Sequence, residues 1–154
     1  MTTTKHFSIQ INHDPATIFA LLTRLAHYGD WLPYSNSYTG LHDISDDPIL
    51  LGSTYRDGHG ALEMHGTITE LVPNHRITFQ QTTRPNLVPF IRSTITITIS
   101  YTLEQNAFGT TLYRDYQLSL SGFFRLIKSV VIKRVTVENE RVLALIKSHL
   151  EADS

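Results

Sequence analysis

The sequence predicts an α+β domain in which a curved, seven-stranded antiparallel sheet wraps around a long C-terminal helix. Apolar residues recur with helical spacing in the segment that ends near residue 31 and again after residue 122. Between these two segments they recur with period two, and turn residues divide this region into six short pieces. With one further strand at the N-terminus, the expected order is strand, two short helices, six strands and a long helix.

The N-terminal elements are predicted from alternation and from a helix-start signal. Apolar and polar residues alternate over 7–11, which is typical of a half-buried strand. Asp14 followed by Pro15 is typical of a helix start, because the proline has no N–H to lose at the first helical position. We therefore expect a helix over 15–25 and a second, short helical piece over 27–31.

The central region is predicted to be an antiparallel meander. Its clearest strand lies at 94–101, where threonine and isoleucine alternate, so that the isoleucines face a core and the threonines face water. Short, turn-rich links are typical of antiparallel neighbours. The six strands are expected near 37–43, 53–58, 62–71, 76–83, 93–104 and 110–120.

The C-terminal segment is predicted to be one helix over 123–150, because its apolar residues return to helical spacing. At 1.5 Å per residue it would be roughly 40 Å long. A helix of that length exceeds any single strand of the meander, so we expect it to lie across one whole face of the sheet.

Composition excludes several classes of function. The chain has 154 residues, which suits one domain over 1–154, and it has no cysteine, so thiolate metal sites and cysteine nucleophiles are excluded. Thirteen basic against fourteen acidic residues provide no electrostatic drive for nucleic-acid binding. The sequence shows no signal peptide and no apolar run long enough to span a bilayer. We expect a soluble, cytoplasmic protein, as a monomer or a homodimer.

Metal binding and catalysis receive little support from the sequence. None of the eight histidines has the spacing of a metal site, so we expect no metal and no cofactor. His59 is the one candidate for a general base, because it lies in a predicted loop near Glu63 and His65. Glu63 and His65 are expected on the solvent face of their strand.

Five segments carry a resemblance to a known family, and they span nearly the whole chain. They lie, in order, at 9–19, 28–33, 52–55, 66–79 and 143–151. In this order they resemble the START-like superfamily (SRPBCC), in its polyketide cyclase/dehydratase branch. The resemblance implies a helix-grip fold, with a cavity for a small hydrophobic molecule such as a lipid, a polyketide or another aromatic or isoprenoid compound. Because the residues give little support for catalysis, we expect a carrier or sensor rather than an enzyme. The alternatives are a cyclase or dehydratase that uses a pocket acid or base such as His59, and an interaction module with a filled core.

Side-chain alternation and an apolar rim of loops predict where the ligand binds. Interior positions of the strands, the start of the long helix and the loops at one end of the meander are expected to line the cavity. The candidates are Trp31, Tyr34, Tyr55, Met64, Phe79, Phe90, Ile97, Ile99, Tyr101, Arg114, Tyr116, Phe123, Ile127 and Val131.

Arg114 is the most distinctive of these candidates. It shares its strand parity with leucines, which places it inward, where an unpaired charge is costly. A buried guanidinium is expected to bind a carboxylate or a ligand that carries a carboxylate or phosphate. The alternatives are a bulge that turns Arg114 outward, or a pair with Glu63 or Asp57.

The start of the long helix carries four cations and no acid over 125–134. Solvated charge on a helix explains such a run. Beside exposed phenylalanines, the same run would favour transient contact with an anionic membrane during lipid transfer.

Overall fold

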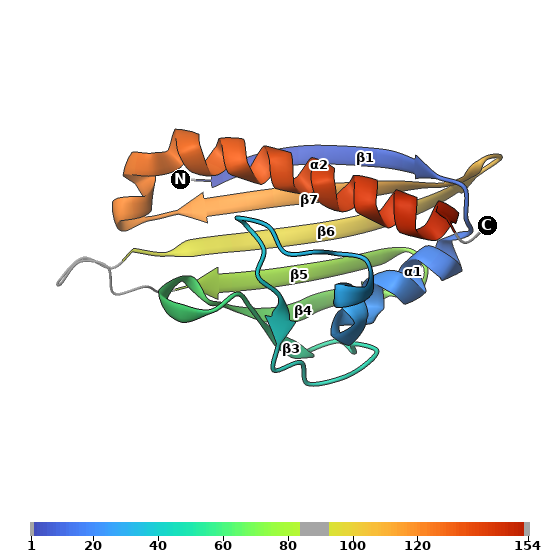
Figure 1. Cartoon of the computed structure of the whole chain (residues 1–154), viewed down its shortest axis with the longest axis horizontal. Coiled ribbons are helices and arrows are strands. Elements are labelled where there is room, and N and C mark those ends of the chain that lie inside the picture. Colours follow the sequence, from blue (N-terminus) through green and yellow to red (C-terminus); the bar gives the residue numbers. More distant parts are fainter. Residues whose placement is uncertain (1, 84–92, 153–154) are drawn as a thin grey trace.

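The computed structural model describes residues 2–83 and 93–152, and it confirms the α+β fold. The strands form one antiparallel sheet in the order β1-β7-β6-β5-β4-β3-β2, and the long helix α2 lies in front of it (Figure 1). The strands are β1 (Thr2–Ile11), β2 (Leu41–His42), β3 (Thr54–Asp57), β4 (Met64–Val72), β5 (Arg76–Thr83), β6 (Ile95–Asn106) and β7 (Gly109–Leu120). The helices are α1 (Pro15–Thr23) and α2 (Lys128–Ala152), with short 3₁₀ helices η1 (Leu25–Asp30), η2 (Gly60–Leu62) and η3 (Gly122–Ile127).

The first and last strands in the chain are neighbours in the sheet. β1 pairs with β7 along its whole length, from Thr2 opposite Ser119 to Ile11 opposite Thr110. β7 also pairs with β6 without a register shift. The register of β7 is therefore set on both sides, and its side chains alternate regularly between the two faces of the sheet.

The apolar core is divided into two clusters. One lies beneath α1, η1 and the C-terminal half of α2, and it includes Ile18, Leu22 and Ile146, all with no exposed surface. The other lies beneath η3 and the N-terminal half of α2, and it includes Leu118 and Phe124. The long helix is thus held at both ends by apolar packing, and the space beneath its middle is left for other groups.

Three predicted boundaries differ from the structure. β1 begins at Thr2 and not near residue 7, because its threonine-rich start pairs with β7. The strand expected over 37–43 is reduced to β2, because the hydroxyl of Ser35 accepts hydrogen bonds from the backbone N–H groups of Ser37 and Tyr38 and turns the chain. The long helix begins at Lys128, since the preceding six residues form the 3₁₀ helix η3.

Among the described residues, no helix combines the length and the apolar character needed to cross a bilayer.

The packing of α2 against the sheet can be tested by one pair of substitutions. Ile146→Ala is expected to lower the free energy of unfolding by about 2–5 kcal/mol, because it leaves a cavity in the larger cluster. Val137→Ala on the same helix is the control, and it should change stability by less than about 0.5 kcal/mol, because its side chain is exposed. Urea unfolding measures both, and equal effects would contradict the packing described.

Candidate functional site

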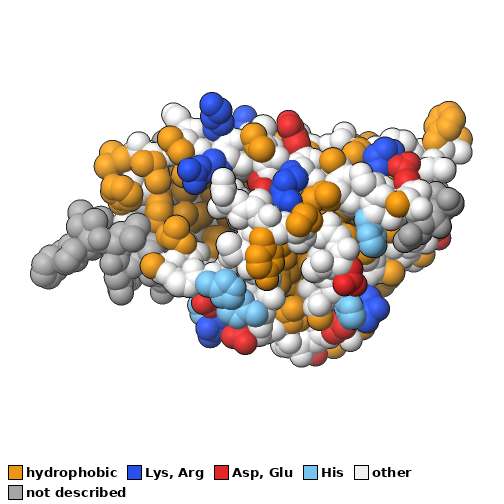
Figure 2. Space-filling model, in the orientation of Figure 1, with side chains coloured by type: hydrophobic (Ala, Val, Ile, Leu, Met, Phe, Trp, Pro, Cys, Tyr) orange, Lys and Arg blue, Asp and Glu red, His pale blue; other side chains and the backbone are white. Residues whose placement is uncertain are grey.

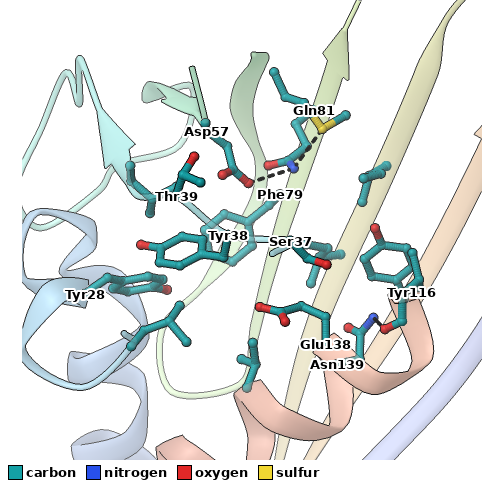
Figure 3. A pocket seen from close by; sticks show the side chains of 18 of the residues that line it. Tyr28, Ser37, Tyr38, Thr39, Asp57, Phe79, Gln81, Tyr116, Glu138 and Asn139 are labelled. Atoms are coloured by element: carbon teal, nitrogen blue, oxygen red, sulfur yellow. Dashed lines mark hydrogen bonds between the residues drawn. The ribbon is translucent and has the colours of Figure 1, made fainter. Parts of the chain in front are cut away.

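A cavity of about 480 Å³ lies between the sheet and the middle of α2 (Figure 3). It separates the two apolar clusters, and both contribute to its walls. Side chains from β3, β4, β5, β6 and β7 form the sheet side, and α2 forms the opposite side. The most buried wall residues are Leu25, Tyr28, Trp31, Leu32, Tyr38, Tyr55, Met64, Phe79, Gln81, Ile97, Tyr101, Arg114, Tyr116, Leu118, Asn139 and Val142.

The mouth of the cavity is marked by those lining residues that are exposed to solvent. They come from the loop before β2, from the region after β3 and from α2, and they are Asn36, Ser37, Thr39, His59, Leu62 and Arg134. The cavity is therefore open to solvent on one side, as a binding pocket must be.

Most of the predicted ligand-binding residues line this cavity. They are Trp31, Tyr55, Met64, Phe79, Ile97, Ile99, Tyr101, Arg114, Tyr116 and Val131, together with His59 at the mouth. Whether they bind a ligand stays a prediction. Phe90 lies outside the described residues.

Three predicted positions are corrected, because they do not line the cavity. The side chain of Tyr34 is 70% exposed and packs edge-on against Tyr38, which takes the inner position. Phe123 and Ile127 lie in η3, where three residues per turn rotate the side chains away from the register of an α-helix. Phe123 is partly exposed, and Ile127 packs against the smaller apolar cluster.

Arg114 points into the cavity and is only 8% exposed. Its Nε donates a hydrogen bond to Oδ1 of Asn139 on α2 (2.5 Å), and Nη1 donates to the hydroxyl of Tyr101 on β6. The guanidinium carbon also lies 5.0 Å from the centre of the Tyr101 ring. Two neutral partners thus hold the cation in place, and no hydrogen bond within the described residues uses Nη2.

Neither alternative for Arg114 is observed. β7 has no bulge, and Glu63 binds Arg56 at 3.1 Å instead. Within the described part of the chain, no carboxylate comes within 4.0 Å of the Arg114 guanidinium, that of Asp57 included. The positive charge is therefore buried without a counter-ion, and a guanidinium has five N–H donors, of which two are used.

A second polar group in the cavity was missed from the sequence. Gln81 on β5 accepts a hydrogen bond from the Tyr55 hydroxyl (2.8 Å) and donates one to Oδ2 of Asp57 (3.1 Å). Figure 3 shows Asp57 and Gln81 on the sheet side, facing Glu138 and Asn139 of α2 across the space. Burial raises the pKa of Asp57 above its ordinary value, although the hydrogen bond from Gln81 and the charge of Arg114 act in the opposite direction.

Glycine at position 66 makes room for this group. Gly66 on β4 lies opposite Tyr55 on β3, and a Cβ there would fall 2.2 Å from the tyrosine ring. The ring can therefore lie across β4 and bring its hydroxyl to Gln81. A glycine inside a strand is the sequence signal that could have indicated this close approach.

The other ionisable groups around the cavity are already engaged or lie at its mouth. Both carboxylate oxygens of Glu138 accept hydrogen bonds from Arg141, at 2.8 and 3.1 Å. The ring of His59 stacks on that of His42, with centroids 4.7 Å apart, and it is exposed. No set of three His, Cys, Asp or Glu side chains that could hold a metal ion occurs in the part of the chain described.

The buried tyrosines of the wall act as neutral hydrogen-bonding groups. Burial raises the pKa of Tyr55, Tyr101 and Tyr116 above the ordinary phenol value. They therefore keep their protons at neutral pH. The hydroxyl of Tyr55 already donates to Gln81, whereas those of Tyr101 and Tyr116 can donate to an oxygen atom of a ligand. The indole N–H of Trp31 is the one buried side-chain polar atom of the described residues without a partner.

Asp57→Asn tests the electrostatics of the cavity through the pH dependence of stability. Because the pKa of Asp57 is raised in the folded state, its contribution to stability is fully present below the ordinary value of 3.8 and is lost as pH rises through the folded pKa. The asparagine keeps the contact with Gln81 but does not ionise. The variant should therefore gain stability relative to the wild type as pH rises from acidic to neutral, measured by urea unfolding. A constant difference over this range would contradict the assignment.

Comparison with known proteins places this geometry in a family. Residues 2–151 match the sequence pattern of the family described as polyketide cyclase/dehydrase and lipid transport. A search of curated proteins found no match. Among solved structures, protein MLL2253 from Mesorhizobium loti is 17% identical to this chain, with a TM-score of 0.70. The alignment covers 99% of this chain and 99% of that protein.

Two further solved structures share the fold. The di-domain ARO/CYC BexL from the BE-7585A biosynthetic pathway is 17% identical, with a TM-score of 0.70 over 96% of this chain and 50% of its own. Ara h 8.0201 is 11% identical, with a TM-score of 0.71 over 99% of each chain. At these identities the likeness shows the fold alone, and it confirms the helix-grip architecture. The family match confirms the resemblance found in the sequence. Because the family pattern extends over nearly the whole chain, this protein belongs to the polyketide cyclase/dehydrase and lipid transport family.

Proposed function

We propose that this protein binds a small hydrophobic molecule in the cavity between the sheet and α2, as a carrier or sensor of that molecule. The observation that carries the proposal is the cavity itself, which keeps the two apolar clusters apart. Its volume of about 480 Å³ lies within the roughly 300–1,000 Å³ of typical small-molecule pockets.

The walls of the cavity account for both affinity and orientation. Apolar and aromatic side chains such as Phe79, Ile97 and Val131 face the space, and burial of apolar ligand surface contributes about 25 cal/mol per Å². The polar groups are few and are held by hydrogen bonds, as at Arg114 and Gln81. Such a site binds through its apolar surface and orients the ligand through a small number of polar contacts.

A cyclase or dehydratase is the second candidate, and one observation favours it. The carboxylate of Asp57 and the guanidinium of Arg114 line the same cavity. A base near an acidic C–H, with a cation near the developing enolate oxygen, is the arrangement that such a reaction requires. His59, the base predicted from the sequence, lies instead at the exposed mouth.

Filling the cavity from the α2 side should abolish binding. Val131 lines the cavity, so Val131→Trp is expected to weaken the binding of prodan, a neutral fluorescent naphthalene dye, by about tenfold or more, which corresponds to 1.4 kcal/mol. The fluorescence titration should give one site per wild-type chain. Val137→Trp, on the exposed face of the same helix, should bind the dye as the wild type does.

Native mass spectrometry of freshly purified protein gives an independent result. A co-purifying compound that is present in the wild type and absent from Val131→Trp would support the proposal. A carrier returns that compound with its mass unchanged after incubation, whereas a dehydratase removes water from it. No co-purifying compound together with equal dye binding by both tryptophan variants would overturn the proposal.

We also propose that the region around η3 contacts anionic membranes transiently. Exposed apolar side chains there, Leu126 and Val130, lie beside Arg125, Lys128 and Lys133. None of these three cations has an ion-pair partner among the described residues. Figure 2 shows hydrophobic side chains gathered at the end of the molecule where η3 and the start of α2 lie, with basic side chains nearby. Apolar side chains with flanking cations fit an anionic lipid surface.

Co-sedimentation with lipid vesicles tests this contact. The wild type is expected to bind vesicles that contain phosphatidylglycerol more strongly than vesicles of phosphatidylcholine alone, and added salt should weaken the binding. Leu126→Ser and Lys133→Glu should each reduce it several-fold, while Val137→Ser, outside the region, should not. Equal binding to both kinds of vesicle, or no effect of Leu126→Ser, would contradict the proposal.

A further inference from the structure

We propose that the cavity selects an amphipathic acid, namely a molecule with an apolar body, a carboxylate that Arg114 binds and a hydroxyl group that Asp57 binds. This inference rests on the proposed function and narrows it from any hydrophobic molecule to hydroxylated acids. It assigns a ligand contact to Asp57, which sequence analysis did not select. The argument depends on which polar atoms of the cavity wall remain without partners.

The end of the cavity that contains Arg114 has the features of an anion-binding site. The guanidinium is more than nine-tenths buried, and no carboxylate of the described residues lies within ion-pair distance. Its two hydrogen bonds go to the neutral side chains of Asn139 and Tyr101, which fix its orientation without neutralising it. Burial of an unpaired cation is costly, and a carboxylate ligand offsets that cost with charge-assisted hydrogen bonds.

The end of the cavity that contains Asp57 can accept a hydrogen bond from a ligand. Gln81 occupies Oδ2, and no hydrogen bond of the described residues reaches Oδ1. Gln81 is itself held by the Tyr55 hydroxyl, so the carboxyl group has a fixed direction. A carboxylate accepts hydrogen bonds, and a ligand hydroxyl that donates to Oδ1 would replace the water lost on burial.

The two ends are separated by apolar surface. β3, which carries Asp57, and β7, which carries Arg114, have three strands between them in the sheet. Phe79 on β5 and Ile99 on β6 lie on these intervening strands and line the cavity. A ligand that satisfies both ends must therefore have an apolar body between its two polar groups.

The remaining charged groups do not supply these functions. Glu138 is neutralised by Arg141 and also accepts a hydrogen bond from Ser35. Arg134 lies exposed at the mouth, where water screens its charge. Arg114 and Asp57 are thus the pair of charged groups with free atoms inside the cavity.

Isothermal titration with a matched set of compounds tests the inference. The set has four members on a naphthalene skeleton, with substituents at opposite ends. The first carries a hydroxyl and a carboxylic acid, and the second carries a methoxy group and the acid. The third carries the hydroxyl alone, and the fourth carries the methoxy group alone. A biphenyl set of the same four members provides a longer body. The wild type should bind one of the hydroxy acids at least about tenfold more tightly than its methyl ether or its phenol.

Substitutions then assign each preference to its residue. Arg114→Met should remove the preference for the hydroxy acid over the phenol, which lacks the acid group. Asp57→Leu should remove the preference for the hydroxyl group over the methyl ether. Arg24→Met and Asp30→Leu carry the same changes outside the cavity and should behave as the wild type does. Thermal melting establishes that each variant is folded. If a variant is unfolded, the affinities of the wild type for the compound set still test the inference.

The possible failures are distinguishable. If no member of either set binds while prodan still binds in the cavity, only the inference is overturned. If instead no member binds, prodan binds equally to both tryptophan variants and no compound co-purifies, the proposed function fails and the inference fails with it. If the methoxy compound binds as tightly as the hydroxy acid in both sets, the cavity binds hydrophobic molecules without the selectivity inferred, and only the inference is overturned. A preference for the acid that persists in Arg114→Met would also overturn it.

Discussion

The contact between Arg114 and Asn139 is the constraint around which this molecule is organised. It joins the middle of β7 to the middle of α2, and Asn139 is the polar residue at the centre of the buried face of that helix. Apolar side chains hold the helix on either side of this contact, in two separate clusters. A leucine in place of Asn139 would remove one of the two hydrogen bonds of the guanidinium and leave Tyr101 as its remaining partner.

The divided core explains why a cavity persists in a protein that is otherwise well packed. Protein interiors close around voids when side chains can reach across them. Here a cation occupies the wall, and apolar side chains gain little by collapsing onto it. On the opposite side the wall is set by Tyr55, whose ring lies over Gly66 and cannot move inward without losing its hydrogen bond to Gln81.

Regular alternation made the sheet predictable, and irregular backbone limited prediction at the site. The parity of β7 was sufficient to place Arg114 and Tyr116 inward, because pairing on both sides keeps that strand regular. Phe123 was misplaced because no pattern of apolar residues separates a 3₁₀ turn from the first turn of an α-helix. Asp57 was considered only as a partner for Arg114, since the contact that orients it comes from Gln81, two strands away in the sheet.

The cost of the empty cavity also determines how the protein responds to its ligand. In the free protein Arg114 is buried and Asp57 is half-buried, and each has hydrogen-bonding atoms that no described residue uses. Their partial removal from water raises the free energy of the folded state. A ligand that satisfies those atoms binds only the folded state, so its affinity appears directly as added stability, by about 2.7 kcal/mol at a hundredfold excess over its dissociation constant. The same two groups that impose a penalty on the fold thereby couple ligand occupancy to the packing of α2. In a sensor, the change in the packing of α2 on ligand binding would be the signal. In a carrier, the added stability would keep the ligand-bound protein folded.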